Sequence, residues 1–81
     1  MEYYSINMPI KEIMSNPELA EKLIGINDDL FFFDDEVHLE IFGGDTILKL
    51  NKTLNLNFSK KDLSEIETIL SHTPIKNERK F

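Results

Sequence analysis

The two histidines, His38 and His72, are the side chains of this chain that titrate closest to neutral pH. A general acid or base of this kind needs a second polar group within hydrogen-bonding reach. His38 falls on one side of an alternating stretch, and His72 follows an amphipathic stretch, so nothing in the sequence brings them together. Cysteine is absent, which excludes thiolate chemistry and disulfides. The sequence therefore predicts a protein that is not an enzyme.

A run of acidic residues offers hard oxygen ligands of the type that calcium binds: Asp28, Asp29, Asp34, Asp35 and Glu36. Calcium loops combine alternating ligands with a glycine at the sharp turn, and "DDLFFFDDE" has neither feature. Gly43-Gly44 also lacks the following lysine and helix start of a phosphate-binding loop. We predict no metal site and no cofactor.

The motif Gly43-Gly44-Asp45-Thr46 has two interpretations. Together with "LNFSKKDL", the stretch "FGGDTILKL" resembles acyl and peptidyl carrier proteins, covering residues 42–48 well and 58–63 loosely. The resemblance implies a helix that starts at Thr46 and a phosphopantetheine arm on that residue, although the family carries serine there. The alternative is the turn of a β-hairpin, because two glycines tolerate the positive φ angles of a type I′ turn.

Hydrophobic alternation on both sides of the glycines favours the hairpin. Val37, Leu39 and Ile41 alternate before the turn, and Leu48 and Leu50 alternate after it. A two-residue turn would pair these positions so that their apolar side chains share one face of a sheet, and a slip by one residue would scatter them. "TLNLNF" (residues 53–58) continues the alternation as a third strand, and "DLFFF" (residues 29–33) is the candidate for a fourth.

Helices are expected on both sides of this segment. Asn16 and Pro17 suit the N-cap and first position of a helix that Gly25 would end. Ser59 and Asp62 form the sequence pattern of a capping box before a second apolar stripe, which includes Ile66 and Leu70. Residues 9–14 could add one helical turn.

The net charge of −6 is unevenly distributed along the 81 residues. Residues 1–45 carry two lysines and eleven acids (2 − 11 = −9), and residues 46–81 carry seven basic groups and four acids (7 − 4 = +3). This polarity disfavours nucleic-acid binding by the first half and permits docking on a basic protein. The other interpretation is a solvated surface that only confers solubility. No membrane span or secretion signal is recognisable, so a cytoplasmic protein is expected.

A further pattern combines "MPIKEI", "LAEKLIGIN" and "DDEVHLEIFGGDTILKL" across residues 8–50. It resembles the swapped-hairpin domain of AbrB-type regulators and related antitoxins. The resemblance implies a β-hairpin, a homodimer and DNA binding through basic residues near the N-terminus. Lys11 is the one basic residue in that part of the chain, which disfavours the DNA-binding role.

We predict a single α+β domain over residues 1–81, with loosely ordered ends at 1–8 and 74–81. A short N-terminal helix would precede an antiparallel meander of three or four strands, and a C-terminal helix would pack on the sheet. The leading function is a non-enzymatic inhibitor, immunity or antitoxin-like factor, or regulator that binds a basic protein partner. The predicted binding residues are acids and aromatics: Asp28, Asp29, Phe32, Asp34, Asp35, Glu36 and Phe42.

Overall fold

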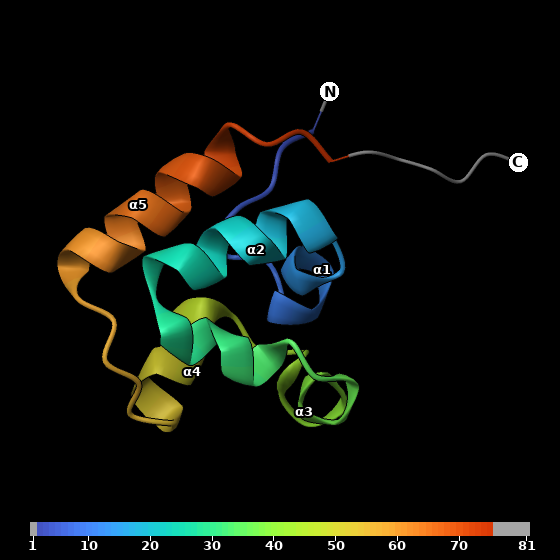
Figure 1. Cartoon of the computed structure of the whole chain (residues 1–81), viewed down its shortest axis with the longest axis vertical. Coiled ribbons are helices and arrows are strands. Elements are labelled where there is room, and N and C mark those ends of the chain that lie inside the picture. The colour runs from blue at the N-terminus through green and yellow to red at the C-terminus, as the bar shows by residue number, and fades with distance from the viewer. Residues whose placement is uncertain (1, 76–81) are drawn as a thin grey trace, which may run out of the picture.

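The computed structural model describes residues 2–75, and these residues fold as a group of helices (Figure 1). In chain order the helices are α1 (Ile10–Met14), α2 (Pro17–Ile26), the 3₁₀ helix η1 (Asp28–Phe33), α3 (Glu36–Phe42), α4 (Ile47–Thr53) and α5 (Lys60–Ser71). No β-strand occurs within residues 2–75, where isolated bridges join Tyr3 to Pro74 and Pro9 to Thr46. The predicted α+β fold with an antiparallel meander is therefore wrong.

The helices expected at the two ends of the chain are confirmed. Asn16 caps α2, with its side-chain oxygen accepting a hydrogen bond from the Leu19 amide at 3.1 Å, and Pro17 occupies the first turn. Ser59 and Asp62 form the predicted capping box of α5. The helical turn expected at residues 9–14 is present as α1. These three helices were recognisable because their starts carry specific capping or proline signals.

The residues predicted to form the central hairpin are two short helices. Asp35 caps α3 through the Val37 amide at 2.9 Å, and Thr46 caps α4 through the Lys49 amide at 3.2 Å. Gly43 has φ −63°, and neither Gly43 nor Gly44 adopts positive φ, so no type I′ turn is formed. The hairpin that the AbrB-type resemblance implied is consequently absent from the described part of the chain.

The other two predicted strands are also replaced. Residues 29–33 lie in η1, which starts at an N-cap where Asn27 accepts a hydrogen bond from the Asp29 amide. Residues 54–59 are an irregular connection between α4 and α5, in which Asn55 takes a left-handed conformation with φ 56°. This connection still contributes to the core, because Phe58 is buried.

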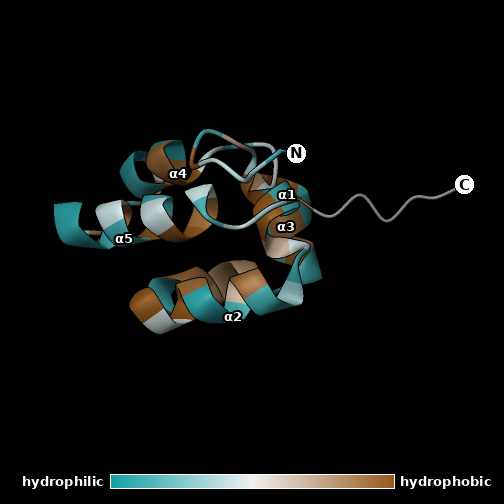
Figure 2. Cartoon of the chain, turned by 90° about the horizontal axis from the view of Figure 1, so that it is seen from above, coloured by the Kyte–Doolittle hydropathy of each residue, from teal (hydrophilic) through white to brown (hydrophobic). Residues whose placement is uncertain are grey.

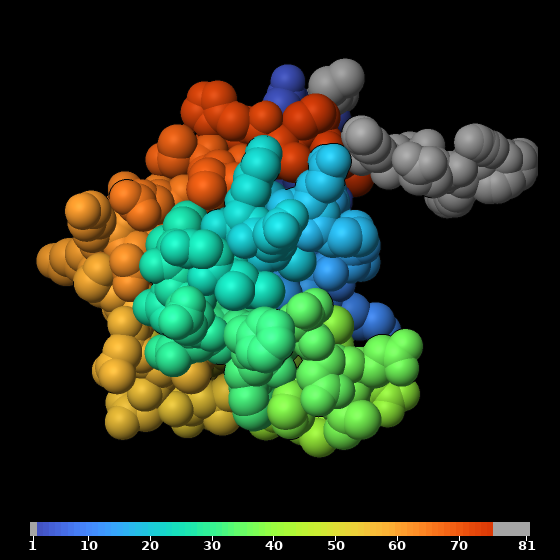
Figure 3. Space-filling view, viewed as in Figure 1, coloured from blue at the N-terminus to red at the C-terminus, as the bar shows by residue number. Residues whose placement is uncertain are grey.

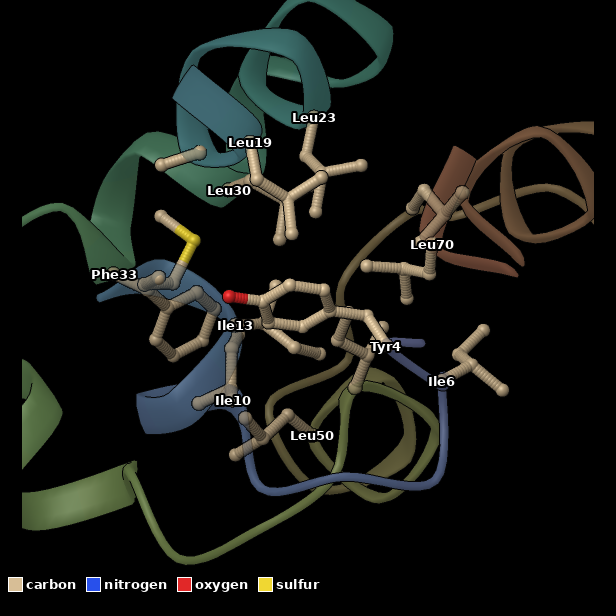
Figure 4. Packing of buried hydrophobic residues seen from close by; sticks show 14 of the residues in the cluster. Tyr4, Ile6, Ile10, Ile13, Leu19, Leu23, Leu30, Phe33, Leu50 and Leu70 are labelled. Carbon is tan, nitrogen blue, oxygen red and sulfur yellow. The ribbon is translucent and has the colours of Figure 1, made fainter. Parts of the chain in front are cut away.

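The hydrophobic core is built from one side of each helix except α3, which buries no residue fully. Each labelled helix in Figure 2 carries both hydrophobic and hydrophilic residues, as amphipathic packing requires. Figure 4 shows Phe33 of η1 in the same cluster as Ile10 and Ile13 of α1. Every buried side chain among the described residues is hydrophobic. The core therefore holds no buried aspartate, glutamate, lysine, arginine or histidine within residues 2–75.

Backbone hydrogen bonds connect the two ends of the described chain. The Tyr4 amide donates to the Thr73 carbonyl at 3.1 Å, and the Ile75 amide donates to the Glu2 carbonyl at 2.8 Å. Tyr4 and Ile6 are buried in the core (Figure 4). Of the ends predicted to be loosely ordered, residue 1 and residues 76–81 lie outside the described residues. No helix within residues 2–75 is long and apolar enough to cross a membrane.

Gly25 does not end α2 as predicted, because the helix continues to Ile26 and the φ angle of Gly25 is not positive. A Cβ atom at this position would meet no heavy atom within 4 Å. We therefore expect Gly25→Ala to stabilise the protein by about 0.5 kcal/mol, since alanine restricts the unfolded chain and has the higher helix propensity. Thermal unfolding followed by circular dichroism should show a midpoint raised by a few degrees. A lower midpoint would contradict the helical assignment of Gly25.

Candidate functional site

The two histidines lie in different parts of the fold, His38 on α3 and His72 directly after α5, and each contacts its own local backbone. The Nδ1 atom of His38 on α3 lies 2.8 Å from the Phe32 carbonyl, and the Nδ1 atom of His72 lies 2.7 Å from the Thr68 carbonyl. A carbonyl oxygen can only accept, so Nδ1 carries the proton in both rings. No group of three or more potential metal-ligating side chains is found within residues 2–75.

The Gly43–Thr46 segment is packed against the start of α1. The Gly43 carbonyl accepts from the Lys11 amide at 3.0 Å, and the Asp45 carbonyl accepts from the Ile10 amide at 2.9 Å. Thr46 stands at the start of a helix, as the carrier resemblance implied. That helix is only seven residues long, and the Thr46 hydroxyl accepts the hydrogen bond that caps it. The observed contacts therefore give the motif a structural role in joining α3, α4 and α1.

The acidic residues predicted as a binding site are gathered on η1 and the start of α3. Asp28, Asp34, Asp35 and Glu36 are exposed, whereas Asp29 is partly buried and accepts from the Asn57 amide at 3.4 Å. We call the exposed side chains of η1 and α3 the η1–α3 surface, and define it by these residues: Asp28, Phe31, Phe32, Asp34, Asp35, Glu36, Val37, Glu40 and Ile41. Figure 3 shows residues of η1 and α3, in green, as one continuous region at the lower right.

The two predicted aromatic anchors differ in accessibility. Phe32 is 40% exposed, and its ring stacks on His38 with centroids 3.9 Å apart. Phe42 is partly buried and packs 5.9 Å from Phe32 and 6.3 Å from Phe33, between centroids. The Phe32 ring is therefore accessible from solvent, and Phe42 packs against it.

The most exposed large apolar side chains of the described residues are three that the sequence did not predict as binding residues. Phe31, Val37 and Ile41 have exposed fractions of 65%, 62% and 66%. The alternating pattern had placed Val37 and Ile41 in the core. In a helix, the inward positions of this segment are Leu39 and Phe42, which are packed against the core. A helical interpretation would therefore have placed Val37 and Ile41 on the outer face.

The charges around these apolar side chains are mostly negative. No lysine or arginine occurs between Lys22 and Lys49, and this interval contains seven acids: Asp28, Asp29, Asp34, Asp35, Glu36, Glu40 and Asp45. Within residues 2–75, one ion pair involves these acids, between Lys49 and Asp45 at 3.4 Å, and the His38 ring lies 3.5 Å from the Asp35 carboxylate. The surface consequently carries an unbalanced negative charge that would attract a basic partner.

Three shallow hollows adjoin the surface. Phe31 lines two of them, one shared with Ala20 and Ile24 of α2 and the other shared with Leu54 and Leu56 of the α4–α5 connection. The third, of about 590 Å³, lies between α1 and α3. The η1–α3 surface thus combines projecting apolar side chains with adjoining hollows, and protein interfaces use this kind of shape complementarity.

Comparison of the chain with protein-family models, with curated proteins and with solved structures finds no match. The candidate function is consequently argued from the η1–α3 surface alone.

Proposed function

We propose that this protein is a binding module that docks the η1–α3 surface on a basic protein partner. The observation that carries the proposal is the exposure of Phe31, Val37 and Ile41 within a segment that contains acids and no lysine or arginine. An exposed group of apolar side chains bordered by charge is characteristic of partner-binding sites. An inhibitor, an immunity or antitoxin-like factor, and a small cytoplasmic regulator all fit this mode of action.

Phe31 is the strongest candidate for the anchor of the interface. It projects between two hollows, and aromatic side chains at the centre of an interface often dominate the binding free energy. Phe32 lies next to it and is held by its stack on His38, so little side-chain freedom would be lost when a partner covers it. The acids around both rings would then guide the approach of a positively charged partner and increase the association rate.

The proposal is tested by affinity capture, identification of the captured protein by mass spectrometry and measurement of its affinity with both proteins purified. Asp28→Lys/Asp34→Lys should weaken that affinity at least about tenfold, because it reverses charges at both ends of η1. Both side chains are exposed and neither makes a hydrogen bond that caps a helix, since Asp34 caps the end of η1 through its backbone amide alone, so the fold should be retained. Asp35 is unsuitable for charge reversal because its carboxylate caps α3.

The matched control is Glu65→Lys/Glu67→Lys, which changes two exposed acids on α5. Both double variants have the same net charge (−6 + 4 = −2), so they separate a local effect from a general one. Equal loss of affinity in the two variants would indicate attraction by total charge alone. Unchanged affinity in Asp28→Lys/Asp34→Lys would remove the acids at the two ends of η1 from the binding site and contradict the proposal.

Modification of Thr46 provides a direct test of the carrier alternative. We expect the intact mass to stay constant when the protein is incubated with a phosphopantetheinyl transferase and coenzyme A. The reason is that the Thr46 hydroxyl already caps α4, and the family modifies a serine. A gain of one phosphopantetheine group that disappears in Thr46→Val would replace the binding-module proposal with a carrier function.

A further inference from the structure

The outer face of α3 has the form of a helix-packing ridge. Val37 and Ile41 are four residues apart and therefore lie one above the other, and the same holds for Glu36 and Glu40. All four side chains are exposed. The helix packs against α1 and η1 through its other side, where Leu39 and Phe42 contact the core. An apolar row beside an acidic row is thus left open along the helix.

The hollow between α1 and α3 adjoins these rows and forms a groove that includes Val37 but not Ile41. Lys11 and Ser15 line it from α1, and Val37 and Leu39 provide apolar surface from α3. Glu36 and Glu40 stand on the α3 side and Lys11 on the α1 side, so the two walls have opposite charge. Rows of side chains spaced by four residues fit the grooves of a second helix.

We infer that the outer face of α3, together with this groove beside it, binds an amphipathic helix of another protein whose apolar stripe is bordered by lysine or arginine. The apolar stripe would cover Val37 and Ile41, and the basic border would lie over Glu36 and Glu40. This is the helix-in-groove mode of recognition, in which a few apolar anchors at helical spacing give affinity and flanking charges give orientation. The inference rests on the proposed function and adds the structural class of the partner.

A second copy of this chain is a poorer occupant of the groove. Each copy has a net charge of −6, so two copies repel each other over distances within the screening length of the solution. Pairing α3 with α3 would also bring the Glu36 and Glu40 rows into a shared interface. Stable dimers usually bury about 800 Å² per partner, far more than two exposed aliphatic side chains supply.

A labelled synthetic peptide of about five helical turns (~18 residues) can serve as the probe, with leucine at i, i+3, i+4 and i+7 and lysine at the other positions. Its fluorescence anisotropy would be measured against the full chain. A second peptide of the same composition but scrambled leucine spacing keeps the charge and removes the apolar stripe. We expect the amphipathic peptide to bind at least about tenfold more tightly than the scrambled peptide, and to bind more weakly as salt is raised.

The protein variant that tests the groove is Val37→Gln/Ile41→Gln. It places glutamine, a better helix former than valine or isoleucine, at two exposed positions. It should weaken binding of the amphipathic peptide at least about tenfold. Leu48→Gln is the matched control, because Leu48 is also an exposed aliphatic residue but lies on α4, and it should leave binding unchanged. Glu36→Gln/Glu40→Gln should reduce the salt dependence, which gives a second and independent measurement.

Several outcomes would overturn the inference. These are no binding of the amphipathic peptide, equal binding of the two peptides, or no effect of Val37→Gln/Ile41→Gln. A wild-type dimer that this variant dissociates would instead assign the groove to contacts between copies. The proposed function fails separately if Asp28→Lys/Asp34→Lys leaves the affinity for the captured partner unchanged, because these residues stand at the two ends of η1 and do not line the groove.

Discussion

Replacement of Phe33 by alanine is expected to remove a large part of the stability of the protein. Phe33 is fully buried and is the largest side chain of the core with no exposed area. Truncation of a buried phenylalanine removes about 3–5 kcal/mol, from the lost transfer free energy and the remaining cavity. A domain of 81 residues has a total stability of roughly 4–12 kcal/mol. Urea denaturation followed by circular dichroism should therefore show a strongly reduced midpoint or no folded baseline.

Phe31→Ala is the matched control, because it makes the same chemical change two residues away in the same helix. Phe31 is 65% exposed, and an exposed side chain of this kind contributes little to stability, so the free energy of unfolding should change by less than about 0.5 kcal/mol. The same variant should weaken binding to the captured partner. Equal destabilisation by the two substitutions would mean that η1 is oriented differently from the structure described above.

The phenylalanine run illustrates why the strand prediction failed. Period-two alternation places Phe31 and Phe33 on one side and Phe32 on the other. A 3₁₀ helix has three residues per turn, so Leu30 and Phe33 share its buried side and the two residues between them face outward. The Asn27 N-cap and the Leu30–Phe33 spacing were visible in the sequence.

The central helices were misread because short segments do not distinguish the two periods. Val37 and Ile41 satisfy i, i+2, i+4 alternation and also the i, i+4 spacing of a helix, and α3 has only seven residues. Asparagine and threonine also lowered the helix propensity of residues 48–58. Burial of Ile47 and Leu50, together with the Thr46 cap, outweighs that propensity in α4. Tertiary packing of this kind cannot be read from a single sequence.

The candidate surface was more predictable than the fold. Acidic clustering and missing lysines are properties of composition, so they hold whether residues 28–45 are strands or helices. The identity of the exposed apolar side chains depends on the element type, which explains why Phe32 and Phe42 were selected and Val37 and Ile41 were not. The charges of the candidate surface could thus be predicted from the sequence, whereas the positions of its exposed apolar side chains required the helical geometry.

Gly43→Ala is expected to be the most disruptive substitution in the loop between α3 and α4. A Cβ atom there would lie 2.8 Å from the Lys11 Cβ and would also clash with the Leu39 carbonyl oxygen. Backbone bonds fix both contacts, because the Gly43 amide donates to Leu39 at 2.8 Å and its carbonyl accepts from Lys11. We expect a loss of about 1–3 kcal/mol, as for other overpacked sites, measured by urea denaturation.

Gly44→Ala provides the control that separates the helical loop from a hairpin turn. A Cβ atom at Gly44 meets nothing within 4 Å, and its φ angle is not positive, so the variant should be neutral or up to about 0.5 kcal/mol more stable. A type I′ turn would require positive φ at both glycines, and both substitutions would then be costly. Destabilisation by Gly43→Ala but not by Gly44→Ala would therefore support the observed packing of the end of α3 against α1. Because that contact also forms one end of the α1–α3 packing, Gly43→Ala should additionally weaken binding of the amphipathic peptide, while Gly44→Ala should leave it intact.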